Sequence, residues 1–170
     1  MKVRLLLVAY GLAASVVTAA PDSGVFVSFE GADEFTDVAD SYSFKERGRD
    51  YHLKELKNFI ERRATARLPE GHRLIITITD VDMAGEFEPW GNPNANDVRV
   101  IKDLYPPRID LRFRLTNAAG DVLAEGERKL RDLGFMYSVR PYDSDVMKYE
   151  KELVGRWIVR ELRTAEYASS

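Results

Sequence analysis

The 170-residue sequence contains no cysteine. We therefore expect no disulfide bond, no thiolate nucleophile, no cysteine-ligated zinc site and no lipid attached to an N-terminal cysteine. A domain with a sufficient hydrophobic core needs no disulfide, so the absence is compatible with an oxidising compartment. The sequence also has no internal repeat and no glycine-rich loop that would bind phosphate groups. Its two histidines, His52 and His72, lie in no recognisable catalytic motif.

One long apolar run stands at the N-terminus, where residues 5–20 follow the basic residues Lys2 and Arg4. A positive start, an apolar run and a small-residue cleavage site are typical of a secretory signal peptide. The run is shorter than the roughly 20 residues that span a bilayer. We predict cleavage after Ala19, a periplasmic location and no membrane anchor after cleavage.

The remaining 151 residues (170 minus 19) suit one domain, residues 20–170. The predicted signal peptide, residues 1–19, contains two basic and no acidic residues, so the net charge after cleavage is 23 minus 28, or −5. A mildly acidic protein has no electrostatic reason to bind nucleic acid. We expect no nucleic-acid partner, and the sequence does not indicate an oligomeric state.

The periodicity of apolar residues predicts four strands, at residues 24–30, 73–81, 108–116 and 122–131. It predicts one amphipathic helix over residues 46–68 and a second that Ser144 or Asp145 caps and that ends near Leu162. Residues 133–143 are expected to be a partly extended connection. The strand at 73–81 is apolar on both faces, which favours a central position in a sheet.

The order of these elements is strand, helix, strand, long loop, hairpin, helix. A strand–helix–strand step favours a parallel pair, whereas a hairpin is antiparallel. The sequence therefore predicts an α+β two-layer sandwich, in which a mixed sheet of about four strands carries both helices on one face. In the hairpin, Arg112 and Arg114 are expected to face Glu125 and Glu127.

The connection between residues 80 and 108 is the candidate functional segment, because so long a loop in a compact domain is usually functional or disordered. Its candidate binding residues are charged or aromatic: Asp80, Asp82, Glu86, Phe87, Glu88, Trp90, Asp97, Arg99, Asp103 and Arg108. If it binds a metal ion, the ligands are Asp80, Asp82, Glu86 and Glu88, since hard cations such as Ca²⁺ take oxygen ligands. Alternatively, Asp80 and Asp82 cap turns and the arginines pair with the glutamates.

Three functions remain open for this segment. Paired carboxylates can act as general acid and base on a glycan, which would make the protein a carboxylate-based or metal-dependent hydrolase of an envelope substrate. Phe87, Trp90 and Tyr105 can instead present an aromatic surface to another protein, or Trp90 can cover an open end of the sheet. We favour a non-catalytic domain that binds an envelope protein or component without a cofactor.

Several stretches carry a resemblance to a known family. They are D-V-D-M-A-G-E-F-E-P-W (80–90), N-D-V-R-V (96–100) with Asp103, P-R-I (107–109) and Y-E-K (149–151). Over essentially the whole chain after the signal peptide, the sequence resembles the exported bacterial proteins of domain of unknown function 3016. The resemblance implies a signal peptide and a small soluble domain, and it implies no activity, cofactor or catalytic residue. A tryptophan precedes P-R-I in that pattern, whereas Pro106 stands there in this chain.

Overall fold

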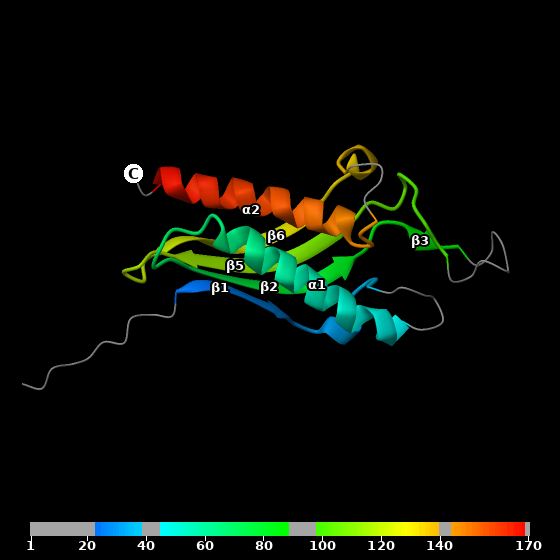
Figure 1. Ribbon diagram of the computed structural model, residues 1–170, viewed down its shortest axis with the longest axis horizontal. Coiled ribbons are helices and arrows are strands. Elements are labelled where there is room, and N and C mark those ends of the chain that lie inside the picture. Colours follow the sequence, from blue (N-terminus) through cyan, green and yellow to red (C-terminus); the bar gives the residue numbers. More distant parts are fainter. Residues whose placement is uncertain (1–22, 39–44, 89–97, 140–143, 169–170) are drawn as a thin grey trace, which may run out of the picture.

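The computed structural model describes residues 23–38, 45–88, 98–139 and 144–168 (Figure 1). Its strands are β1 (Gly24–Phe29), β2 (Arg73–Asp82), β3 (Glu86–Phe87), β4 (Arg99–Val100), β5 (Arg108–Thr116) and β6 (Val122–Arg131). Its long helices are α1 (Lys45–Thr65) and α2 (Lys148–Ala168), and its short 3-10 helices are η1 (Ala32–Glu34) and η3 (Phe135–Tyr137). Of the described helices, none is long and apolar enough to cross a membrane.

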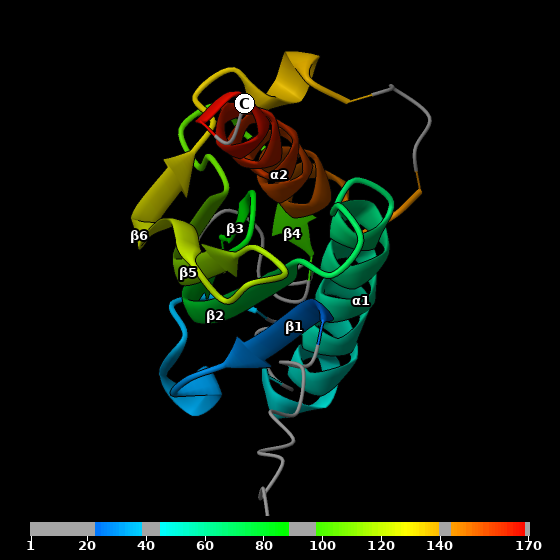
Figure 2. The same cartoon turned by 90° about the vertical axis from the view of Figure 1, so that its left-hand side faces the viewer.

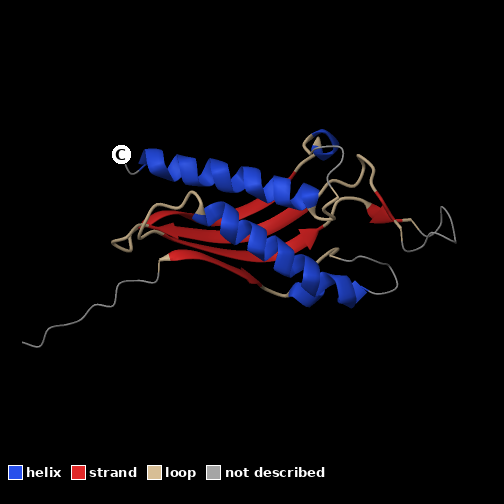
Figure 3. Ribbon diagram, in the orientation of Figure 1, coloured by secondary structure: helices blue, strands red, loops and turns tan. Residues whose placement is uncertain are grey.

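Four strands form one mixed sheet in the order β1-β2-β5-β6. β1 is parallel to β2, and the other two pairs are antiparallel. Both long helices cover the same face of this sheet, α1 over β1 and α2 over β5 and β6 (Figures 2 and 3). The predicted α+β sandwich and the central position of β2 are thus confirmed, and β3 and β4 add a separate two-stranded ladder.

The hydrophobic core lies between the sheet and the two helices. On β5, Ile109, Leu111, Phe113 and Leu115 alternate inward and are buried. The helices bury side chains at three- and four-residue spacing against them: Leu53, Leu56, Ile60 and Ala64 from α1, and Leu153, Val154, Trp157, Ile158 and Leu162 from α2. Burial of each of the leucine and isoleucine side chains contributes roughly 1.5–3 kcal/mol, which fixes both helices on the sheet.

The second helix begins later than the sequence predicts. The Asp145 carboxylate accepts a hydrogen bond from the Met147 backbone N–H (2.9 Å), and its carbonyl accepts one from Lys148 (3.2 Å). These bonds form a turn before the helix, and Val146 in this turn is exposed. The described part of the preceding connection contains η3, a helical turn rather than extended chain.

The face of the sheet away from the helices carries charged rows, as predicted. The register places Arg112 opposite Glu127 and Arg114 opposite Glu125, and the Arg114–Glu125 ion pair measures 3.7 Å. Arg112 forms its ion pair with Glu30, at the end of β1. Exposed pairs of this kind contribute roughly 0–1 kcal/mol each.

One arginine on β6 points toward the helices instead. The Arg128 guanidinium donates a hydrogen bond to Glu161 of α2 (2.9 Å) and lies over the Phe113 ring, with 4.8 Å between the Arg128 Cζ and the ring centroid. The Trp157 indole N–H donates to the same Glu161 carboxylate (3.0 Å). This network fastens α2 to the edge strand β6.

We predict that Glu161→Ala lowers the free energy of unfolding by about 1–3 kcal/mol, because it leaves Arg128 and the Trp157 N–H without their acceptor. The exposed Glu125→Ala is the matched control and should lower it by less than about 1 kcal/mol. Urea denaturation of the two variants measures the difference. Equal losses in both variants would contradict a structural role for the Glu161 network.

Candidate functional site

The described parts of the long connection form an outgrowth at the end of β2. The chain leaves the sheet after Asp82, forms the β3–β4 ladder and re-enters the sheet at Arg108. In the ladder, Glu86 lies opposite Val100 and Phe87 opposite Arg99. We refer to residues 83–88 and 98–107 as the platform.

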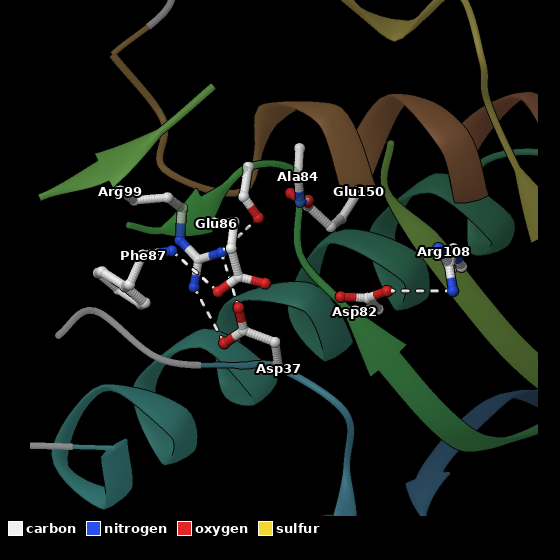
Figure 4. Close-up of polar contacts among 9 residues, drawn as sticks. Asp37, Asp82, Ala84, Glu86, Phe87, Arg99, Arg108 and Glu150 are labelled. Carbon is white, nitrogen blue, oxygen red and sulfur yellow. Dashed lines mark hydrogen bonds and ion pairs between the residues drawn. The ribbon is translucent and has the colours of Figure 1, made fainter. Parts of the chain in front are cut away.

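Arg99 holds the platform to the body of the domain (Figure 4). Its guanidinium forms a bidentate ion pair with Asp37, with 2.8 Å between Nη1 and Oδ2 and 3.0 Å between Nη2 and Oδ1. Nη1 also donates to the Gly85 carbonyl (3.1 Å), and Cζ lies 4.5 Å from the centre of the Phe87 ring. Both charged side chains are largely buried, 11% and 17% exposed. A bidentate arginine–carboxylate pair is among the stronger and more directional polar contacts in proteins.

Asp37 reaches this position because its backbone pairs with the end of β2. Its N–H donates to the Val81 carbonyl (3.0 Å), and its own carbonyl accepts from the Met83 N–H (3.0 Å). These two bonds form a parallel bridge with Asp82. The backbone of Asp37 is therefore held at the end of β2, and its carboxylate lies within reach of Arg99.

The turn between β2 and β3 requires a glycine. Gly85 has a φ of 84°, and a Cβ there would lie 2.6 Å from Ile101 Cδ1 and 2.8 Å from the Val100 carbonyl oxygen. Its N–H donates to the Tyr105 carbonyl (3.0 Å). A left-handed backbone and a close approach of the two platform strands both favour glycine.

Glu150 supports the platform from the first turn of α2 (Figure 4). Its side chain is fully buried, and Oε1 accepts a hydrogen bond from the Ala84 N–H (2.7 Å). Oε2 is buried without a hydrogen-bond partner among the described residues. Burial raises the pKa of Glu150 to about 7, although the Ala84 N–H and the Arg99 charge act in the opposite direction.

Sequence reasoning did not select Glu150 as a site residue. A signal was present, because Glu150 precedes Leu153 by three and Trp157 by seven residues and so lies on the predicted apolar stripe of α2. It is also the central residue of the Y-E-K motif. A glutamate on a core-facing stripe indicates a buried polar contact.

The aspartates at the end of β2 have separate partners. Asp80 accepts hydrogen bonds from the Thr36 N–H (2.7 Å) and hydroxyl (2.8 Å). Asp82 lies opposite Arg108, at 3.6 Å. Burial raises the pKa of Asp82, and the carboxylates of Asp37, Asp80 and Glu86 add to the effect, whereas Arg108 lowers that pKa.

The glutamates of the platform make local contacts. Both oxygens of Glu88 lie 2.7 Å from Lys102 Nζ, and the Tyr105 hydroxyl donates to Oε1 (3.0 Å). The hydrogen bonds from Lys102 and Tyr105 lower the pKa of Glu88. Glu86 accepts a hydrogen bond from the Phe87 N–H (2.9 Å). The contacts of Glu88 join the two halves of the platform to each other.

The structure thus brings most of the predicted site residues to one end of the sheet. Arg99 and Arg108 pair with Asp37 and Asp82, and not with the glutamates that the sequence suggested. Within the described ranges, no three His, Asp or Glu side chains form a group that could hold a metal ion, and Asp80, Asp82, Glu86 and Glu88 are included in that statement.

The aromatic candidates differ in their accessibility. Phe87 is buried beneath Arg99 and so belongs to the framework of the platform, not to its surface. Asp103 is exposed. Trp90 and Asp97 lie outside the described residues, so the predictions for these two residues stay predictions.

We predict that the Glu150 carboxyl contributes a fall of about 3 kcal/mol in the free energy of unfolding of the wild type as the pH rises from 4.5 to about 7. The sign follows from the raised pKa, because the folded state then binds more protons than the unfolded state across this interval. Glu150→Gln keeps an acceptor for Ala84 and cannot ionise, so it should remove this decline and be more stable than wild type at pH 8. Urea denaturation at several pH values measures it.

The matched control is Glu152→Gln, which changes a partly exposed glutamate on the same helix. It should keep the wild-type dependence of stability on pH. A Glu150→Gln protein with the wild-type dependence would show that the Glu150 carboxyl does not change its protonation on folding.

A comparison with known protein families matches most of the described domain. The family model described as "protein of unknown function (DUF3016)" matches residues 23–160, from the residue before β1 into α2. A comparison with curated proteins gives no match. The match spans every platform residue and Glu150, and it confirms the resemblance found from the sequence motifs. The chain belongs to the DUF3016 family of proteins of unknown function.

Proposed function

We propose that this protein is an exported, periplasmic domain without catalysis of its own, and that its platform binds another protein of the cell envelope. The observation that supports this proposal is the exposure of apolar side chains on the platform. Leu104 is 70% exposed, and Val98 and Ile101 are exposed beside it in the sequence. Clustered exposed apolar side chains with a polar surround are typical of protein-binding surfaces.

The framework beneath these side chains supports the same function. Arg99 fixes the β4 side of the platform to Asp37, and Glu88 fixes Lys102 and Tyr105. A surface that is already ordered loses less conformational entropy when a partner binds. The platform is therefore suited to present Val98, Ile101 and Leu104 in one arrangement.

The charge around the platform indicates the kind of partner. The exposed Asp103 lies between Ile101 and Leu104 in the sequence, and the partly exposed Asp82 and Glu86 lie at the root of the platform. The fitting partner surface has an apolar centre with basic residues around it, since complementary charge gives specificity and speeds association.

The alternative function is a carboxylate-based hydrolase that acts on an envelope substrate, and the observation in its favour is Asp82. Its pKa is raised by burial among other carboxylates, as a general acid requires. However, Asp80 accepts two hydrogen bonds from Thr36, and the acceptor oxygens of Glu88 are occupied by Lys102 and Tyr105. These contacts favour a structural role for the acidic residues, so we rank the binding function first.

To test the proposal, the immobilised mature domain is exposed to periplasmic extract, and bound proteins are identified and quantified. We expect the double variant Ile101→Ser/Leu104→Ser to bind the specific partner at least about tenfold more weakly, because each lost apolar contact contributes roughly 1.5–3 kcal/mol. Val122→Ser is the matched control, since Val122 is also exposed but lies at the opposite end of the sheet. It should bind as wild type does.

Urea denaturation of both variants confirms that each one folds, since Ile101 also lies against the Gly85 turn. Equal capture of every bound protein by the wild type and both variants would contradict the proposed surface. Asp82→Asn tests the alternative, because a hydrolase that uses this carboxyl as its general acid should lose its turnover in this variant.

A further inference from the structure

A second exposed apolar group lies in the connection between β6 and α2. Tyr137 is 96% exposed, Leu133 is 71% exposed and Met136 is 45% exposed. The three side chains fall within five residues, around η3. We refer to residues 133–137 as the knuckle, which lies beyond the end of β6 in Figure 1.

The knuckle has a fixed framework. Phe135 is buried at its centre and packs edge-to-face on Tyr149 of α2, with ring centroids 4.9 Å apart. The Asp132 carboxylate accepts hydrogen bonds from the Gly134 N–H (3.0 Å) and the Ser138 hydroxyl (2.8 Å). The exposed side chains therefore project from an ordered turn that is fastened to both neighbouring elements.

A basic cavity of about 380 Å³ lies beside the knuckle, between β6 and α2. Its lining combines four cationic residues, one anionic residue and three apolar residues: Lys129, Arg131, Arg156, Arg160, Asp132, Leu130, Leu153 and Trp157. The one anionic residue, Asp132, forms an ion pair with Arg156. The other three cationic residues have no second carboxylate beside them in the lining.

Among the described residues, two of these three cations, Arg131 and Arg160, have side chains that form no hydrogen bond or ion pair, and both are exposed. The third, Lys129, has an ion pair with Asp110 at 3.7 Å. Arginine is the side chain best suited to bind phosphate oxygens, because its planar donors match their geometry.

We propose that the knuckle and the basic cavity together form a site for a membrane surface that contains anionic phospholipid. Arg131 and Arg160 bind lipid phosphate groups, and Leu133, Met136 and Tyr137 enter the interfacial layer. Tyrosine is suited to this layer because its ring is apolar and its hydroxyl stays hydrated. An apolar group beside basic residues is the general composition of a peripheral membrane site.

The shape of the site favours a lipid surface over a protein. The knuckle side chains protrude, and insertion into a fluid interface needs no complementary groove. Addition of a peptide strand to β6 is disfavoured, because Arg128 points inward from this edge strand and the β5–β6 register shifts near Thr116. The chain as a whole is acidic, at −3, so the basic surface acts locally and its attraction must weaken with salt.

The site uses different residues from the platform, where the exposed apolar side chains stand beside acidic residues. We therefore expect substitutions of the knuckle to weaken membrane binding and leave the proposed protein binding intact, and substitutions of the platform to do the reverse. The two surfaces can be tested in one set of variants, each serving as the control for the other.

The test measures co-sedimentation of the mature protein with lipid vesicles. We expect binding to vesicles of phosphatidylethanolamine and phosphatidylglycerol, little binding to vesicles of phosphatidylcholine alone, and release by salt. Arg131→Gln/Arg160→Gln should weaken binding by about tenfold or more, since it removes two charges at the surface. Leu133→Ser/Tyr137→Ser should weaken it similarly, whereas Ile101→Ser/Leu104→Ser should bind as wild type does.

Three results would overturn the proposal. The first is absence of binding to the anionic vesicles, and the second is equal binding by the wild type and both site variants. The third is stabilisation of the protein by inorganic phosphate through Arg131 and Arg160 without vesicle binding, which would make this a site for a soluble anion. Melting curves of the variants confirm that each one folds.

Discussion

The bidentate ion pair between Arg99 and Asp37 is the contact on which the position of the platform depends. It joins residues 62 apart in the sequence and ties a long connection to the end of β2. Closing so long a loop is entropically unfavourable, and the loss must be offset by contacts within it. The Gly85 carbonyl, the Phe87 ring and the Asp37 carboxylate all contact the same guanidinium, so one side chain of β4 joins the β3 segment to the segment of Asp37.

Two further polar contacts fix α2 against a strand or turn. Arg128 and Glu161 join β6 to α2, and Glu150 joins α2 to the platform at Ala84. Glu150 is the less favourable of the two, because one of its oxygens is buried without a partner. We interpret Glu150 as a structural compromise that sets the position of the platform against α2, since a fully apolar contact would not select the Ala84 N–H.

The sequence predicts the sheet better than the site, for a physical reason. The alternation of Ile109, Leu111 and Phe113 records the burial of a whole strand face, so it is visible locally. The partner of Arg99 is not visible in this way, because Asp37 lies in a separate polar segment and nothing in its neighbours distinguishes it from a solvated aspartate. Phe87 was expected at the surface because aromatic residues fit both a surface and a core. Glu150 and Arg128 break their local patterns and could have been suspected from that alone.

Amide hydrogen exchange at Ala84 and Gly85 tests most directly whether the platform is part of the ordered domain. Both amides donate to acceptors within the structure, Glu150 and the Tyr105 carbonyl. We predict that the two amides exchange only through openings whose free energies are close to those of the β2 amides. In Arg99→Ala, we expect the two amides to exchange much faster than the amides of β2. Exchange at the rate of an unstructured loop in the wild-type protein would contradict an ordered platform, and with it the surface on which the proposed binding depends.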